Sequence, residues 1–332
     1  MQKTDERAEM QGNALHLTAN LFAIPFGLTG LAQTWSAVTR LAGASDWLGN
    51  VLWIVAALAW LIILPAYLAN VAEQGRWKTE LSDPTFGPFT VLIVIVPMQL
   101  GARLAEDARG AGEVIFWVSV ILVVLNGAWI TGDWIVGDYD LRRWHPGYYL
   151  PTAAGGLIAG DAAAELGFTT LSHVLFGLGI TSFIVLGSII ALRLYDVESL
   201  PPPLLPTIAI ELAPPVVAGN TWFILNDGKI DTPASILAGL SLLWTLVQFR
   251  LIPLYRRAPF GLGYWAFCFP FAAAATYGVR WLAAEHVTGG AGLAYALVGV
   301  LTAGFALLAA RTVTGLIDGT FLPRVPAPVE PG

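Results

Sequence analysis

Ten apolar stretches of about 20 residues run along this sequence, and each odd-numbered stretch carries a proline at or near its middle. The prolines are Pro25, Pro97, Pro151, Pro214 with Pro215, and Pro270. Because proline cannot donate to the carbonyl four residues earlier, it leaves backbone groups that lipid cannot satisfy. The alternation therefore predicts that the odd-numbered stretches face other protein or a watery cavity.

The ten stretches predict membrane-spanning helices in an all-α integral membrane protein. Their expected bounds are Leu17 to Arg40, Leu48 to Ala72, Phe86 to Leu104, Val114 to Ile135, Tyr148 to Ala164, Thr169 to Leu194, Leu204 to Leu225, Pro233 to Pro253, Pro259 to Ala284 and Gly290 to Leu316. The fifth is the least apolar, because it contains three glycines and Asp161. A hydrophobic share of 56% with 12% charged residues is typical of a polytopic membrane protein.

Flanking segments complete the expected domain organisation. Residues 1–13 are polar and predict a disordered cytoplasmic tail, with no cleavable signal peptide. Residues 14–318 form the ten-helix channel domain, and the proline-rich end at residues 319–332 predicts a second disordered cytoplasmic tail. The net charge of −6 argues against a nucleic-acid partner. Cys268 is the only cysteine, so no intrachain disulfide is expected.

The basic residues predict the orientation of the helices. If the N-terminus is inside, twelve of the 17 Lys and Arg residues fall on the inner side. The other five are Arg40, Arg103, Arg109, Lys229 and Arg280. Because basic loops stay in the cytoplasm, we expect a multi-pass protein of the inner (plasma) membrane with both termini cytoplasmic.

The prolines recur at intervals of roughly 60 residues, the length of two spans with their loops. The repeating unit is then a helical hairpin that occurs five times and always enters the membrane in the same direction. Five hairpins in a ring would place the odd helices inside, lining a central pore, and the even helices outside against lipid.

Three stretches resemble a known family. They are Phe22 to Trp35, Pro201 to Gly219 and Pro259 to Pro270. They are similar to the tellurite-resistance and C4-dicarboxylate transporter family, which includes the slow-type anion channels of plant guard cells, and the resemblance covers about Leu17 to Leu316. It implies a homotrimer in which each protomer has its own pore, with five inner helices surrounded by five outer ones.

The resemblance also implies an anion path that a phenylalanine of the ninth span closes near its middle. The family's Trp-x-x-x-Phe-Pro pattern falls on Trp265, Phe269 and Pro270, so Phe269 is the expected gate. Pro270 is expected to bend the helix at the height of this ring. A ring held in a bend can plug a narrow pore and clear it by a rotamer change. Phe267 and Phe271 lie within one helical turn of Phe269, so the sequence leaves open which of the three rings is the gate.

Polar groups within the odd spans are candidates for the lining of this pore. They are Gln99, Asn220 and Thr276, together with the ring of Phe26 and the acid Glu211. An ionisable group at the depth of Glu211 is expensive and is expected to be functional. A charged Glu211 in the lumen would repel anions. The sequence therefore leaves two roles open for Glu211: it takes part in proton coupling, or it is paired with a backbone or basic group.

No cofactor, metal site or enzymatic activity is expected. The four histidines do not form a facing pair that could ligate haem, and the chain has no Cys/His zinc spacing, P-loop or nucleophile elbow. The expected partners are the lipid bilayer and small anions such as chloride, nitrate or organic acids.

These features predict a passive channel of the cytoplasmic membrane that conducts small monovalent anions. One alternative is a secondary carrier that exports C4-dicarboxylates or related acids, with proton coupling through Glu211 or a role in tellurite resistance. Another is a membrane enzyme or haem subunit, which would need an interfacial polar cluster that the sequence does not display.

Overall fold

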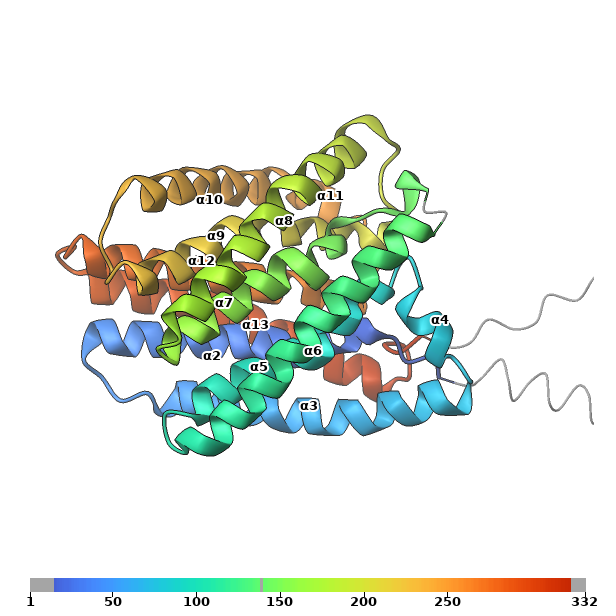
Figure 1. Cartoon of the computed structure of the whole chain (residues 1–332), viewed down its shortest axis with the longest axis horizontal. Helices are drawn as coiled ribbons and strands as arrows, with labels where there is room; N and C mark the ends of the chain where they lie inside the picture. Colours follow the sequence, from blue (N-terminus) through green and yellow to red (C-terminus); the bar gives the residue numbers. More distant parts are fainter. Residues whose placement is uncertain (1–14, 138–139, 324–332) are drawn as a thin grey trace, which may run out of the picture.

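The computed structural model describes residues 15–137 and 140–323 of the chain. This part contains twelve α-helices and no β-strand. Several helices, among them α2, α3, α10 and α12, run roughly along the long axis, and α6 and α8 cross diagonally in front of them (Figure 1). The predicted tail at residues 1–13 lies outside the described residues, and so do residues 324–332 of the tail predicted at residues 319–332.

The even-numbered stretches are uninterrupted α-helices. They are α3 (Trp47–Glu73), α6 (Arg109–Val136), α8 (Thr169–Asp196), α10 (Thr232–Arg250) and α13 (Gly290–Ile317). Only 17% to 33% of the residues in their most apolar parts are buried. A helix that is apolar all round and yet exposed suits a lipid environment.

Each odd-numbered stretch instead combines a short 3₁₀- or π-helical part with an α-helix. The pairs are η1 (Ala19–Phe22) with α2 (Ala23–Ala42), η2 (Gly87–Val91) with α5 (Leu92–Leu104), η4 (Pro146–Tyr149) and η5 (Leu150–Ala154) with α7 (Gly155–Glu165), η6 (Pro202–Leu212) with α9 (Ala213–Leu225), and η7 (Leu262–Phe267) with α12 (Cys268–Ala284). We call these five pairs the inner segments. In three of them, 67% to 83% of the most apolar part is buried.

Most of the prolines lie where the helix type changes. Pro25 and Pro270 are each the third residue of an α-helix, and Pro214 and Pro215 directly follow the first residue of α9. The missing N–H is tolerated there because the first turn of an α-helix has no intrahelical acceptor for it. The sequence predicted bends within continuous helices, whereas these prolines stand at the beginning of an α-helix. Two prolines are exceptions: Pro97 lies inside α5, and Pro151 is the second residue of the π-helical η5.

The inner segments contact one another in a closed order: α2 with α5, α5 with α7, α7 with α9, α9 with α12, and α12 with α2. Each even-numbered helix packs against the inner segment that precedes it in the chain. The short helices α4 (Trp77–Leu81), η3 (Leu141–Arg143) and α11 (Ile252–Tyr255) lie in the connections.

Eight of the ten predicted spans are long and apolar enough to cross a membrane within the described part of the chain. The fifth and ninth stretches, η4 to α7 and η7 to α12, do not meet that criterion. Both belong to the closed circle of inner segments, where contacts with protein replace contacts with lipid.

Glycines in the fifth stretch allow a very close crossing of α7 and α8. A Cβ atom on Gly156 would lie 2.7 Å from the backbone nitrogen of Gly179, and one on Gly179 would lie 2.5 Å from the backbone nitrogen of Leu157. Small residues at such a crossing let two membrane helices pack backbone to backbone. Gly156, which weakens the apolar pattern of the fifth stretch, therefore serves its packing against Gly179 of the sixth.

A buried histidine fixes the beginning of the fifth stretch. The Nε2 of His145 lies 3.0 Å from the carbonyl oxygen of Thr85, and its Nδ1 accepts from the backbone N–H of Gly147. Neutral imidazole with its proton on Nε2 satisfies both contacts. Burial lowers the pKa of His145 to about 4.

This histidine predicts a loss of stability in mild acid. Since the unfolded state has a His pKa of about 6.5, it binds more protons than the folded state between pH 6.5 and pH 4. The contribution of His145 is therefore complete above pH 6.5 and falls by up to about 3 kcal/mol as the pH drops to about 4. We expect the melting temperature in detergent to fall more steeply over this range in the wild type than in His145→Gln. Equal slopes for the two proteins would contradict the role of His145.

The two ends of the described chain meet. The backbone N–H of His16 donates to the carbonyl oxygen of Pro323 at 2.8 Å, and the side chain of Phe321 is buried. Packed structure therefore continues through residues 319–323, past the predicted boundary at residue 318.

Candidate functional site: a row of cavities through the inner segments

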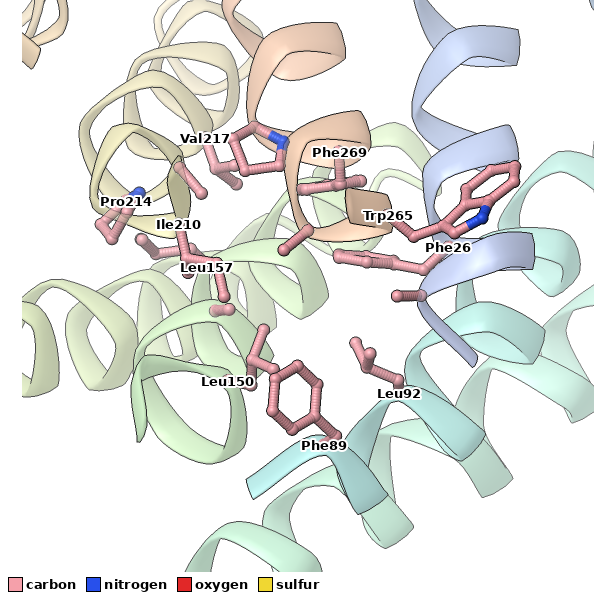
Figure 2. A pocket seen from close by; sticks show the side chains of 15 residues that line it. Phe26, Phe89, Leu92, Leu150, Leu157, Ile210, Pro214, Val217, Trp265 and Phe269 are labelled. Atoms are coloured by element: carbon pink, nitrogen blue, oxygen red, sulfur yellow. The ribbon is translucent and has the colours of Figure 1, made fainter. Parts of the chain in front are cut away.

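A small central cavity of about 30 Å³ lies between the inner segments, and every one of the five contributes to its wall. The lining is almost wholly apolar, as Figure 2 shows, and consists of Ala23, Phe26, Phe89, Leu92, Leu150, Ala154, Leu157, Ile210, Ala213, Pro214, Val217, Trp265, Ala266, Phe269 and Pro270. A cavity of this volume holds one or two water molecules.

Two further cavities adjoin the central one. An inner vestibule of about 250 Å³ shares Ala23, Phe89 and Ala266 with it. An outer cavity of about 20 Å³, toward the C-terminal ends of the inner α-helices, shares Val217 and Phe269 with it. The three cavities therefore form a row, and Phe269 stands between the central and outer members.

Two stacked phenylalanines close this row. The rings of Phe26 and Phe269 are nearly parallel, with an interplanar angle of 16° and centroids 3.8 Å apart. Both side chains are buried. Figure 2 shows them face to face on one side of the central cavity, across from Phe89 and Leu150. Both rings line the central cavity, and that of Phe269 also lines the outer one.

The neighbouring phenylalanines of the ninth stretch point elsewhere. Phe267 makes an edge contact with Tyr255, with ring centroids 4.8 Å apart, and Phe271 lies 6.3 Å from Phe267 by the same measure. Neither is among the residues that line the three cavities. The geometry selects Phe269 among the three rings as the one on the row of cavities.

Glycines on α2 bring Phe26 close to Phe269. A Cβ atom on Gly27 would lie 2.5 Å from the Cβ of Cys268, and one on Gly30 would lie 3.0 Å from the Cδ2 of Phe269. The backbone of α2 thus passes directly against the beginning of α12, which holds the two rings in contact.

The outer cavity collects polar side chains from all five inner segments. Besides Phe269, it is lined by Gln33, Arg40, Gln99, Ile158, Asp161, Glu165, Val217, Asn220, Ala273, Thr276 and Arg280. Gln99, Asn220 and Thr276 were predicted from the sequence as lining groups, and they meet here; Phe26 lines the central cavity instead.

Groups on neighbouring helices form hydrogen bonds with some of these polar side chains. The hydroxyl of Thr29 donates to Oε1 of Gln99 at 2.8 Å, and Nδ2 of Asn220 donates to the carbonyl oxygen of Ala273 at 3.0 Å. The hydroxyl of Thr276 donates a hydrogen bond of 3.0 Å to the hydroxyl of Thr34. Nε2 of Gln99 and Oδ1 of Asn220 are buried and have no hydrogen-bond partner among the described residues.

Glu211 lies away from the row of cavities. Its Oε2 accepts a hydrogen bond of 2.9 Å from the hydroxyl of Tyr149, and it is not among the lining residues of the three cavities. Pro214 and Pro270 line the central cavity, whereas the other predicted prolines do not line any of the three.

Four charged or polar lining residues were missed at the level of sequence: Gln33, Arg40, Asp161 and Glu165. The sequence carries a signal for two of them, Gln33 and Arg40. Phe26, Gln33 and Arg40 are seven residues apart, and Phe269, Ala273, Thr276 and Arg280 follow steps of four, three and four. Such spacings place residues on one face of a helix, so the face of each ring could have been followed outward to its polar end.

Within the described residues, no group of three or more His, Cys, Asp or Glu side chains could hold a metal ion.

Comparison with known proteins agrees with this geometry. The SLAC1 family model, described as voltage-dependent anion channel, matches residues 16–313. The tellurite resistance protein TehA homolog of Haemophilus influenzae is 28% identical over 309 residues, which span 92% of each chain. The S-type anion channels SLAH2 and SLAH3 of Arabidopsis thaliana are 28% and 21% identical, over 57% and 43% of their own lengths. The chain is thus a multi-pass membrane protein without enzymatic activity, and it belongs to the SLAC1 family of voltage-dependent anion channels.

Proposed function

We propose that this protein is a passive channel for small monovalent anions, with a separate pore in each protomer that Phe269 closes. One observation carries the proposal: all five inner segments line a single row of cavities, and a stacked pair of phenylalanines interrupts it. An apolar constriction of this kind blocks ions by sterics and dewetting, and a rotamer change can clear it.

The architecture in the membrane follows from the same geometry. Ten spans form five hairpins, the odd-numbered spans surround the pore, and the exposed apolar faces of the even-numbered helices contact lipid. The fifth and ninth spans need less hydrophobicity because their neighbours are protein. An apolar central wall binds anions weakly, so easily dehydrated anions such as chloride and nitrate should pass best.

We propose that both termini lie in the cytoplasm and that the protein resides in the inner membrane. The contact between His16 and Pro323 supports termini on one side. Loops assigned to the same side also touch: Arg193 donates to the carbonyl oxygen of Arg142, and Arg109 to that of Leu166. The excess of Lys and Arg at the end where the termini meet supports a cytoplasmic assignment for that end. A homotrimer is the expected assembly.

Bilayer recordings with purified protein test the proposal. We expect ohmic currents that reverse near the equilibrium potential of chloride when chloride is asymmetric, with a low open probability in the wild type. Reversal at the potassium potential would contradict anion conduction. Uphill accumulation of malate in vesicles under a proton gradient, without ohmic current, would instead indicate a carrier for C4-dicarboxylates.

A further inference from the structure

We propose that the outer cavity is a single-anion binding site, in which Gln99 and Arg280 provide the donors and Asp161 keeps the affinity low. This inference rests on the proposed function and assigns the first resting place of an anion beyond Phe269. The ligand is a monovalent anion of chloride to nitrate size, because a cavity of about 20 Å³ leaves room for a single small occupant.

The first donor is the amide of Gln99. This side chain is 2% exposed and lines the cavity. Its Oε1 lies 2.8 Å from the hydroxyl of Thr29, which is equally close to the carbonyl oxygen of Phe26, and its Nε2 has no hydrogen-bond partner among the described residues. An unsatisfied buried N–H is costly in an empty site. An anion beside Nε2 would accept this hydrogen bond.

The second donor is the guanidinium of Arg280. Its Nη1 donates to the backbone carbonyl of Asn220, which anchors the side chain in the cavity wall. The hydrogen bonds of Arg280 to other described residues use only this nitrogen, so its remaining N–H groups are available. An arginine anchored in this way presents donors to an anion at a fixed position.

Asp161 is close to Arg280 without binding it tightly. The distance from Oδ1 of Asp161 to Nη1 of Arg280 is 3.9 Å, and Oδ1 has no hydrogen-bond partner among the described residues. The carboxylate therefore lowers the local positive potential while leaving the guanidinium donors free.

The four charged side chains of the cavity are Arg40, Arg280, Asp161 and Glu165, whose formal charges sum to zero. Arg40 and Glu165 are exposed at the rim, whereas Asp161 is buried near Arg280. A neutral site with oriented donors binds an anion only weakly. Conduction needs that balance, since an ion must both enter a site and leave it.

Chloride binding to purified protein tests the site through two variants of nearly unchanged shape. The melting temperature is measured as a function of chloride, with gluconate holding the ionic strength constant. We expect Asp161→Asn to bind chloride about tenfold more tightly, since it removes one negative charge near Arg280. Gln99→Met should bind about tenfold more weakly. Gln248→Met, a buried amide outside the row of cavities, should leave the affinity unchanged.

The outcomes separate this site from the channel itself. If Phe269→Ala carries chloride current but Asp161→Asn does not bind chloride more tightly, the site is wrong and the channel stands. If the affinity shifts as expected while no variant conducts, the site stands and the channel proposal fails. Should Gln99→Met not fold, the affinity of Asp161→Asn decides alone.

Discussion

Anion current through a Phe269→Ala variant is expected to exceed wild-type current by about tenfold or more at equal protein density and voltage. The ring of Phe269 separates the central cavity from the outer one, and no other aromatic residue lines both. Removing it joins the two cavities. Phe26 stays beside the opening, so the double variant with Phe26→Ala should conduct still more. Planar bilayers with symmetrical chloride measure the effect.

Phe267→Ala is the matched control for this experiment. Phe267 lies two residues away on the same segment, but its ring packs against Tyr255 outside the row of cavities. Its removal should leave the conductance near that of the wild type. Equal currents from well-inserted Phe269→Ala and wild-type protein would overturn the gate, and a large current from Phe267→Ala would place the gate in another register.

A Gly179→Ala substitution is expected to destabilise the protein by about 2 kcal/mol or more. The new Cβ would lie 2.5 Å from the backbone nitrogen of Leu157 and 2.9 Å from the carbonyl oxygen of Ala153. Backbone atoms cannot rotate away as a flexible side chain can, so α7 and α8 would have to separate. Thermal unfolding in detergent, followed by intrinsic fluorescence, should show a lower melting temperature.

Gly177→Ala, on the same helix, provides the comparison. A Cβ atom at Gly177 meets nothing within 4 Å. Since glycine in a helix is less favourable than alanine by roughly 0.5–1 kcal/mol, this variant should match or slightly exceed the wild type in stability. A melting temperature of Gly179→Ala at or above that of Gly177→Ala would show that the crossing is not tight.

The alternation of prolines predicted the two classes of segment that the fold displays. Proline position depends on local backbone chemistry, which the sequence carries directly. The sequence could not predict how each proline changes the helix around it. Pro270, for example, could bend a continuous helix or stand in the first turn of a new one, and the outcome depends on where η7 ends and α12 begins. At that boundary Gly27 and Gly30 let α2 pass directly against Cys268 and Phe269, a contact between distant parts of the chain.

The sequence predicted which side chains line the cavities only where a local motif indicated their position. Phe269, Gln99, Asn220 and Thr276 line the row of cavities. Glu211, an acid in a similar local setting, turns instead to Tyr149. A polar residue that binds another buried side chain and a polar residue that lines a cavity cannot be told apart in a sequence, since both stand within an apolar stretch.

The sequence alone determined that this protein is helical and membrane-embedded, with buried and exposed apolar stretches in alternation, because hydrophobic length and proline chemistry act locally along the chain. Only the tertiary structure decided which ring closes the row of cavities and which charges meet beyond it. Arg40, Asp161 and Arg280 come from three different helices. Their meeting depends on the closed order in which the inner segments pack, and that order is a property of contacts between distant residues.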